Sequence, residues 1–400
     1  MSKLLQINVT ANVGSTGRIA EHIGLLAKNQ GWDSYIAYGR SGQPSNSNLI
    51  KVGNMLDILY HVLITRLLDR HGLGSRIATK RLIKQIKEIQ PDIIHLHNIH
   101  GYYLNYKILF EYLAKSDIPI VWTLHDCWPF TGHCAYFDEP NCYKWKEGCE
   151  NCPYSHSYPK SMIVDMSKRN YKLKKSLFGS LGKTLYLVSV SEWLYKFTKE
   201  SFLYDSKGIV IHNGIDLEKF NVVLTPKANR FVILGVAMPW DKRKGLTDFY
   251  QLRECLDINK YDIVLVGLSE EQIKALPSGI IGKTRTNSIE ELVRLYCSAD
   301  VFINPTYADN FPTTNIEALA CGTPVITYRT GGSPEAVTPQ IGAVVKQGDV
   351  DGIINAIHML EQRDRDELRK VCRTYAEEHF DKNKCFQQYI ELYNEILSNK

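Results

Sequence analysis

A strand–helix–strand stretch in the last third of the chain constrains the fold most strongly. Two apolar runs, 299–305 and 323–327, are typical of short buried strands. Between them, Thr314 and Glu317 have the spacing of a helix capping box, and Gly322 is a typical helix end. The order of these signals predicts a βαβ unit, and therefore a parallel sheet covered by helices.

Two acidic residues accompany the start of this predicted helix. Asp309 precedes it and Glu317 lies in its first turns, with seven residues between them. The free N–H groups of a helix N-terminus bind anions, so a ligand site is expected here. Glu317 has two interpretations, a capping residue only or a ligand-binding carboxylate, and the local sequence leaves both open.

The whole stretch resembles a known motif. The acidic pair, the small residues after Glu317 and the Gly-x-Pro-Val ending are similar to the donor site of retaining glycosyltransferases of GT-B fold, glycosyltransferase family 4. The resemblance continues through 331–335, which is similar to the family's GG-x-x-E loop. The chain departs from the pattern at Asp309, where most members carry glutamate.

The resemblance implies an α/β protein with two Rossmann-like domains that face each other across a cleft. Four hundred residues are also more than one hydrophobic core usually spans. We expect an acceptor-side domain at 1–215 with a cysteine-rich insertion at 127–153. A nucleotide-sugar-binding domain is expected at 216–380, and a C-terminal helix at 381–400 that packs back on the first domain.

Composition narrows the class of protein. The apolar fraction of 44% and the charged fraction of 23% are those of a soluble globular protein. A net charge of +5 without a concentrated basic module argues against a nucleic-acid partner. No signal peptide and no apolar run long enough to span a membrane is visible. We therefore expect a cytoplasmic protein whose ten cysteines are thiols or metal ligands.

The resemblance assigns roles to residues of the second domain. Lys244 matches the family's phosphate-binding lysine, while Met238 stands where many members carry an arginine, for which Arg243 is the expected substitute. Glu317 would bind the ribose hydroxyls and Asp309 the hydroxyls of the donor sugar. The donor-binding residues implied in this way are Arg243, Lys244, Phe311, Pro312, Thr313, Thr314 and Glu317.

A glycine loop follows the first predicted strand. It leads into a predicted helix at 19–30, and its glycines allow a tight turn at the helix N-terminus. The pattern lacks the Lys-Ser/Thr of a P-loop, so a packing turn is as well supported as a phosphate or sugar site. The family has a similar loop that faces donor and acceptor, which makes Gly14, Gly17 and Arg18 candidates.

Histidines accompany two predicted strands of the first domain. His125 follows the predicted strand 118–124, at the end where parallel sheets bind ligands. The family's histidine at this point contacts the donor sugar, which makes His125 a catalytic candidate with Asp309 and Glu317. The alternative is a structural histidine held by Asp126. His95 and His97 alternate along an earlier strand, so we expect one of them to face the core, in preference to a metal pair.

The insertion contains five cysteines. Cys149 and Cys152 form a C-x-x-C, and a cytosolic cluster of this kind favours a structural, tetrahedral zinc. The predicted ligands are Cys134, Cys142, Cys149 and Cys152, with Cys127 or His133 as possible substitutes. The alternative is a set of plain thiols. The resemblance implies no metal for catalysis.

Two segments of the first domain bear on membrane contact. The very apolar helix predicted at 55–68 is interpreted first as a buried core helix, with an interfacial, lipid-facing helix as the alternative. The basic helix predicted at 161–177 has either a solvated face or an affinity for anionic lipid. Because both lie on the expected acceptor side, we predict reversible, peripheral attachment to the cytoplasmic face of an anionic membrane.

The sequence as a whole predicts a retaining hexosyltransferase-type enzyme. It would move a sugar from a nucleotide diphosphate sugar to a glycan acceptor, often a lipid-linked one in this family. Two alternatives remain at this point: a GT-B epimerase of nucleotide sugars, and a catalytically weak sugar-nucleotide-binding protein.

Overall fold

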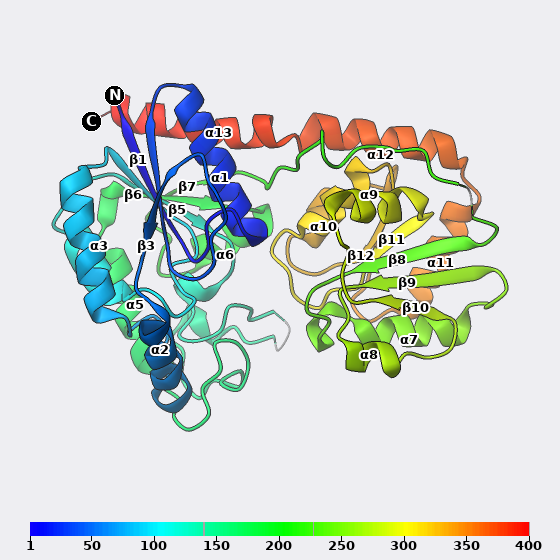
Figure 1. The fold of residues 1–400 in the computed structure, drawn as a ribbon. Coiled ribbons are helices and arrows are strands. Elements are labelled where there is room, and N and C mark those ends of the chain that lie inside the picture. Colours follow the sequence, from blue (N-terminus) through cyan, green and yellow to red (C-terminus); the bar gives the residue numbers. More distant parts are fainter. Residues whose placement is uncertain (139–140, 227, 400) are drawn as a thin grey trace. The chain divides into compact units, whose positions relative to one another are not determined.

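The computed structural model describes residues 1–138, 141–226 and 228–399. The chain divides into two compact units: unit 1 comprises Met1–His212 and Phe386–Lys400, and unit 2 comprises Asn213–Cys385 (Figure 1). The domain boundary predicted after residue 215 lies close to the observed one, which follows His212.

Unit 1 is built on a seven-stranded parallel sheet of order β3-β2-β1-β4-β5-β6-β7. Strands β4 and β5 are buried along their whole length, as expected for a parallel sheet covered on both faces. The strands are β1 (Lys3–Asn8), β2 (Asp33–Tyr38), β3 (Asn48–Lys51), β4 (Ile93–Leu96), β5 (Ile120–Leu124), β6 (Leu185–Ser189) and β7 (Lys207–Val210). The helices are α1 (Gly14–Asn29), α2 (Met55–Leu68), α3 (Arg76–Ile89), α4 (Tyr106–Leu113), α5 (Ser167–Gly179), α6 (Glu192–Glu200) and the C-terminal part of α13 (Lys382–Ser398).

Aromatic packing joins the helices of unit 1 to its sheet. The ring of Phe178 on α5 lies 4.4 Å from that of Phe110 on α4 and 4.9 Å from that of Trp122 on β5, centroid to centroid. Helix α13 packs through buried aromatic side chains as well, including Tyr389 and Tyr393, and it also makes polar contacts. The Tyr393 hydroxyl lies 2.6 Å from His95 Nδ1, and Thr123 donates to the Tyr389 hydroxyl.

Unit 2 repeats the architecture with a six-stranded sheet of order β10-β9-β8-β11-β12-β13, also parallel. The strands are β8 (Phe231–Val236), β9 (Tyr261–Val266), β10 (Ile280–Lys283), β11 (Val301–Asn304), β12 (Val325–Tyr328) and β13 (Gly342–Val345). The helices are α7 (Leu246–Cys255), α8 (Glu270–Lys274), α9 (Ile289–Ser298), α10 (Thr313–Ala320), α11 (Val350–Glu361) and α12 (Arg365–His379).

The strand order reverses once in each sheet, between β1 and β4 in unit 1 and between β8 and β11 in unit 2. Loops that leave neighbouring strands in opposite directions open a crevice at such a point, which is where doubly wound sheets bind ligands. Both units are therefore Rossmann-like α/β domains, as predicted. None of the described helices is long and apolar enough to cross a membrane.

Two expectations for unit 1 were wrong. Helix α5 begins at Ser167, so residues 161–166 lie outside it, and its Lys174 is buried, donating to the carbonyls of Trp128 and Thr131. Helix α2 has the predicted bounds but is not a core helix, because most of its large apolar side chains are exposed.

Candidate functional site

The lysine and the acid predicted for the donor site meet in unit 2. Lys244 lies in the loop after β8 and Asp309 in the loop after β11, on either side of the strand-order reversal. Lys244 Nζ lies 2.6 Å from Asp309 Oδ2, with 17% and 16% of the two side chains exposed. A short, mostly buried ion pair that still reaches solvent can exchange its carboxylate for another anion.

Local backbone geometry fixes the position of Lys244. Its N–H donates to the Asp241 side chain, which caps a short 3₁₀ helix, Lys242–Lys244. Gly245 follows at φ 72°, and a Cβ there would lie 2.2 Å from the Pro305 carbonyl oxygen. Glycine is required because any side chain would push the lysine loop away from the Asp309 loop.

Arg243 binds the backbone of the Asp309 loop. Its Nη1 donates to the Ala308 carbonyl at 2.9 Å, and its own carbonyl accepts from the Tyr307 N–H at 2.7 Å. Met238 is 81% exposed. That Arg243 substitutes for the arginine that many family members carry at the position of Met238 stays a prediction.

The capping box predicted for α10 is wrong. The helix begins at Thr313 after Pro312, and no side chain caps it. Proline fits the helix start because its missing N–H would be unpaired there in any case. Glu317 instead accepts a hydrogen bond at Oε2 from the hydroxyl of Tyr296 on α9, at 3.1 Å. This contact orients the carboxylate without using it as a cap.

A buried amide network lies beneath the same helix start. Asn315 Oδ1 accepts from Asn304 Nδ2 at 2.8 Å, and Asn315 Nδ2 donates to Ser333 Oγ at 3.1 Å. The network joins the end of β11, the first turn of α10 and the loop 331–335. Gly331 completes the contact, since a Cβ there would lie 1.6 Å from the Asp309 carbonyl oxygen.

Phe311, Thr313 and Thr314 occupy the approach to α10. Phe311 is buried, with its ring 5.9 Å from that of Phe380, whereas the two threonines are partly exposed. Sequence reasoning missed Tyr296, Asn315 and Asp248 in this region. Asp248 is buried and accepts from the hydroxyl of Tyr328 at 2.6 Å.

In unit 1, the glycine loop forms a tight entry to α1. Gly14 has φ 68°, and a Cβ on Gly17 would lie 2.7 Å from Thr10 Oγ1. No side chain caps the helix at Val13, and Arg18 is exposed. Gly14, Gly17 and Arg18 therefore lie beside the carboxyl end of β1, where the predicted site requires them.

His125 ends β5 and belongs to a chain of hydrogen bonds. Gln6 Nε2 donates to the Ala20 carbonyl, so Gln6 Oε1 accepts from His97 Nε2 at 3.1 Å. His97 Nδ1 then accepts from His125 Nε2 at 3.2 Å, which places the proton of neutral His125 on Nε2. Burial lowers the pKa of His125 to about 4, against an opposing effect of Asp126, so the ring is neutral near pH 7.

The residues around His125 make further buried contacts. Asp126 pairs with His100, at 2.8 Å between Oδ2 and Nε2. His95 and His97 are both buried, whereas one was expected to face the core. His95 lies on the same side of β4 as His97, with the two ring centroids 4.0 Å apart, and it reaches Thr123 and Tyr393.

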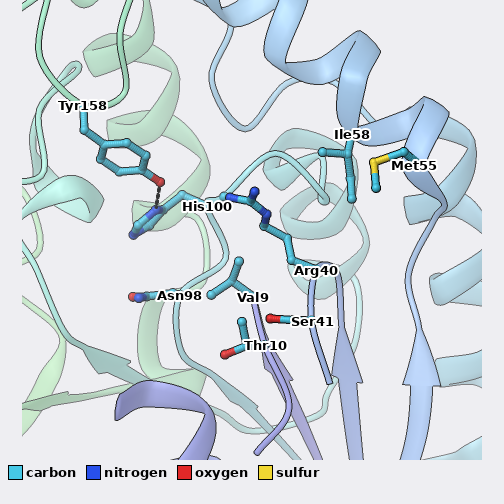
Figure 2. Close-up of a pocket in the computed structure, with 10 residues that line it drawn as sticks. Val9, Thr10, Arg40, Ser41, Met55, Ile58, Asn98, His100 and Tyr158 are labelled. Carbon is cyan, nitrogen blue, oxygen red and sulfur yellow. Dashed lines mark hydrogen bonds between the residues drawn. The ribbon is translucent and has the colours of Figure 1, made fainter. Parts of the chain in front are cut away.

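A cavity of about 560 Å³ opens beside this region (Figure 2). His100 Nδ1 lies 3.0 Å from the Tyr158 hydroxyl on one wall, and Arg40 extends into the space between this pair and Ile58. The lining residues come from α2 and from the segments after β1, β2, β4 and β5: Val9, Thr10, Arg40, Ser41, Met55, Ile58, Asn98, His100, Gly101 and Tyr158.

The cysteine-rich segment brings its thiols near one another. Cys142, Cys149 and Cys152 each raise the pKa of Cys134, after the larger effect of burial, and the Gly132 N–H donates to Cys149 Sγ at 3.2 Å. Across residues 1–138, 141–226 and 228–399, however, no three His, Cys, Asp or Glu side chains are arranged to hold a metal ion. The zinc site stays a prediction.

Comparison with known proteins places this geometry in a family. The family model described as Glycosyltransferase Family 4 matches residues 17–219, and that described as Glycosyl transferases group 1 matches residues 220–379. WcaC of Escherichia coli (strain K12), which carries the name of a colanic acid biosynthesis glycosyl transferase, is 25% identical over 369 residues. The match covers 87% of this chain and 88% of WcaC.

A second relative has a more specific name. It is the N,N'-diacetylbacillosaminyl-diphospho-undecaprenol alpha-1,3-N-acetylgalactosaminyltransferase of Campylobacter jejuni, 25% identical over 234 residues, which are 53% of this chain and 61% of the relative.

Solved structures show the same fold. Sucrose-phosphate synthase from Thermosynechococcus elongatus has a TM-score of 0.74 at 16% identity, over 100% of both chains. Anabaena Alr3699/HepE in complex with UDP-glucose has a TM-score of 0.63 at 15% identity, over 100% of both chains. Two parallel α/β sheets, a match to both family models and the GT-B architecture of the structural neighbours together establish that this chain is a glycosyltransferase of family 4.

Proposed function

We propose that this enzyme transfers a hexosyl group from a nucleotide diphosphate sugar to a lipid-linked glycan during polysaccharide synthesis, with retention of anomeric configuration. The observation that carries the proposal is the 2.6 Å pair of Lys244 and Asp309 at the strand-order reversal of unit 2. A cation and an acid meet there at the edge where a doubly wound sheet binds nucleotides.

The chemistry asks for stabilisation of negative charge. When the bond between sugar and diphosphate breaks, charge develops on the leaving phosphate, and a fixed cation lowers the energy of that state. Lys244 supplies the cation, and the N–H groups at the start of α10, at Thr313 and Thr314, add partial positive charge. Asp309 binds hydroxyls of the donor sugar.

Glu317 binds the ribose. Its carboxylate, on α10, is oriented by the Tyr296 hydroxyl, and a carboxylate in this position can accept hydrogen bonds from ribose hydroxyls. His125 is neutral and holds its proton on Nε2 toward His97, which suits a ring that contacts a sugar hydroxyl. Retention follows the family, through front-side displacement, and we propose that catalysis requires no metal.

The relatives support the biological setting. WcaC is named for colanic acid biosynthesis, and the Campylobacter enzyme for an acceptor on diphospho-undecaprenol. Anabaena Alr3699/HepE holds UDP-glucose. We place the reaction on the cytoplasmic side of the membrane, where the free thiols of the ten cysteines remain reduced.

Product analysis tests the proposal. The purified enzyme is incubated with single nucleotide sugars and a lipid-linked glycan extract, and released nucleoside diphosphate is measured. NMR of the product then reports its anomeric configuration. Transfer with release of nucleoside diphosphate and retained configuration supports the proposal. A product still attached to the nucleotide would identify an epimerase, and an inverted product would overturn the retaining mechanism.

A matched variant pair connects activity to the site. Lys244→Ala removes the proposed phosphate contact, whereas Lys260→Ala removes an exposed lysine from its pair with Glu361 elsewhere in unit 2. We expect transfer to fall only in the first variant.

A further inference from the structure

Helix α2 buries two polar side chains and exposes most of its large apolar ones. Only His61 and Thr65 of Met55–Leu68 are buried, and both are polar. The exposed large apolar residues of the helix, with exposed fractions from 38% to 74%, are Met55, Leu56, Leu59, Tyr60, Leu63, Leu67 and Leu68. A soluble monomer seldom exposes a continuous apolar surface of this kind to solvent, which indicates that this surface binds a partner.

The inverted orientation is built into the structure. His61 Nε2 accepts from the N–H groups of Gly72 at 2.9 Å and Gly74 at 3.3 Å, so Nδ1 carries the proton and donates to Ser75 Oγ at 2.9 Å. Burial lowers the pKa of His61 to about 3, which keeps the ring neutral. Rolling the helix to bury its leucines would break all three bonds, so the polar contacts hold the apolar face outward.

The length of α2 suits a surface rather than a spanning position. Fourteen residues make a helix about 21 Å long. The hydrocarbon core of a bilayer is about 30 Å thick, so such a helix lies along the interface with its apolar side in the acyl region. Figure 1 shows α2 at the periphery of unit 1, away from the sheet.

A second apolar pair extends this surface. The Met162 N–H donates to the Arg66 carbonyl at 2.7 Å, which brings Met162 and Ile163 to the C-terminal end of α2. Both side chains are exposed, by 57% and 72%. We call these two residues and the seven exposed apolar residues of α2 the α2 face.

Cations lie at the C-terminal end of the α2 face. Arg66 and Arg70 are exposed at its C-terminal end. Asp69 accepts from the Met166 N–H at 2.8 Å and so ties the start of α5 to the same end. Helix α5 then presents Lys168, Arg169, Lys172 and Lys175 to solvent, although Lys168 pairs with Glu150 at 2.7 Å. An apolar stripe with neighbouring cations is complementary to a bilayer that contains anionic lipid. A second copy of this chain is a poorer partner, because its own cations would repel those of the first.

We propose that the α2 face is a membrane-docking surface that inserts into the interface of an anionic bilayer. The cavity of Figure 2 shares Met55 and Ile58 with α2, so its mouth adjoins the inserted helix. A lipid-linked acceptor then enters from the bilayer, with the Arg40 guanidinium placed to bind its phosphate. Docking rests on the exposed face alone, whereas the acceptor route rests on the proposed function.

Flotation with vesicles tests the docking. Full-length protein is mixed with vesicles of phosphatidylcholine alone or of phosphatidylcholine with phosphatidylglycerol, at low and at high salt. We expect binding to the mixed vesicles that weakens as salt rises, because screening removes the contribution of the cations. No binding at low salt would overturn the proposal.

Matched variants assign the binding to α2. Leu59→Gln with Leu63→Gln changes two exposed leucines outside the cavity lining, and Ile281→Gln with Met359→Gln changes two exposed apolar residues of unit 2. The α2 pair should reduce vesicle binding at least about tenfold, since burying each leucine contributes more than a tenfold preference. The unit 2 pair should bind as the wild type does. Equal binding by both pairs, or a wild-type dimer that only the α2 pair dissociates, would overturn the proposal.

A further readout separates the two proposals. Donor hydrolysis in water should be the same in the Leu59→Gln/Leu63→Gln variant and the wild type, while transfer to a lipid-linked acceptor in vesicles should fall. Wild-type transfer in vesicles by this variant would reject the acceptor route. If the wild type neither hydrolyses nor transfers any donor, the proposed function fails, and vesicle binding still decides the docking.

Discussion

Lys244→Ala removes the side-chain cation that pairs with Asp309, and its effect can be estimated from the geometry. In the free enzyme Lys244 Nζ contacts Asp309 Oδ2 at 2.6 Å, and 17% of the lysine side chain is exposed. Losing a preorganised charge that stabilises a leaving diphosphate costs about 2–4 kcal/mol in the transition state. That is a fall of about 30- to 900-fold in kcat/KM.

The measurement is initial-rate kinetics with the donor identified by screening, following released nucleoside diphosphate. Lys260→Ala, which removes an exposed lysine from its pair with Glu361, is the control and should retain wild-type kinetics. A thermal melt of each variant shows whether lost activity reflects lost folding. A Lys244→Ala enzyme that folds and keeps kcat/KM within threefold of the wild type would refute the assignment of Lys244 to the phosphate.

For Asp309, the ion pair leads us to expect the opposite effect on diphosphate binding from that of Lys244→Ala. With Asp309→Asn, Lys244 loses its competing carboxylate, so nucleoside diphosphate alone should bind about as well or up to about tenfold tighter, while sugar transfer falls sharply. Asp309→Glu should be tolerated in transfer assays, because the family usually carries glutamate here; an amide as active as the acid would make Asp309 structural. His97→Leu should lower the rate of transfer while leaving the products of donor hydrolysis unchanged, because it removes the nitrogen that accepts the hydrogen bond from His125. A wild-type rate of transfer would reject the role of His97 in orienting His125. Elemental analysis of protein purified without chelator should find about one zinc per chain in the 127–153 segment, and no zinc with freely titrating thiols would discard the site.

The sequence was most informative where local signals and packing agree. The bounds of α2 match those predicted from the run at 55–68. Buried parallel strands are recognisable because both faces are covered, which leaves continuous apolar runs. The lysine and acid of the donor site were found through the family resemblance, and the 2.6 Å contact between them comes only from the structure.

The errors arose where tertiary contacts override local signals. Thr314 and Glu317 have capping-box spacing, yet the residue before the helix is Pro312 and not Thr314. Tyr296, from another helix, donates to the Glu317 carboxylate. Lys174 belongs to a basic run but is drawn inside by two backbone carbonyls and the ring of Trp128, 3.4 Å from its Nζ. No local pattern reports such partners.

The hydrophobic pattern of the sequence could not predict which side of α2 is buried. The helix is apolar almost all round, a pattern that indicates either a core helix or a lipid-facing one. The choice depends on His61, whose partners lie in the loop that follows the helix, at Gly72, Gly74 and Ser75. A single buried histidine thus determines which side of the helix faces outward.

The central claim, that unit 2 holds a nucleotide diphosphate through Lys244 and Glu317, is tested most directly by calorimetric titration. Wild-type protein, Lys244→Ala and Glu317→Gln are each titrated with a nucleoside diphosphate, its monophosphate and its 2′,3′-dideoxy diphosphate. We predict that the wild type prefers the diphosphate over both analogues. Lys244→Ala should lose the preference over the monophosphate, and Glu317→Gln the preference over the dideoxy compound. A wild type that binds all three equally, or variants that keep both preferences, would contradict the account.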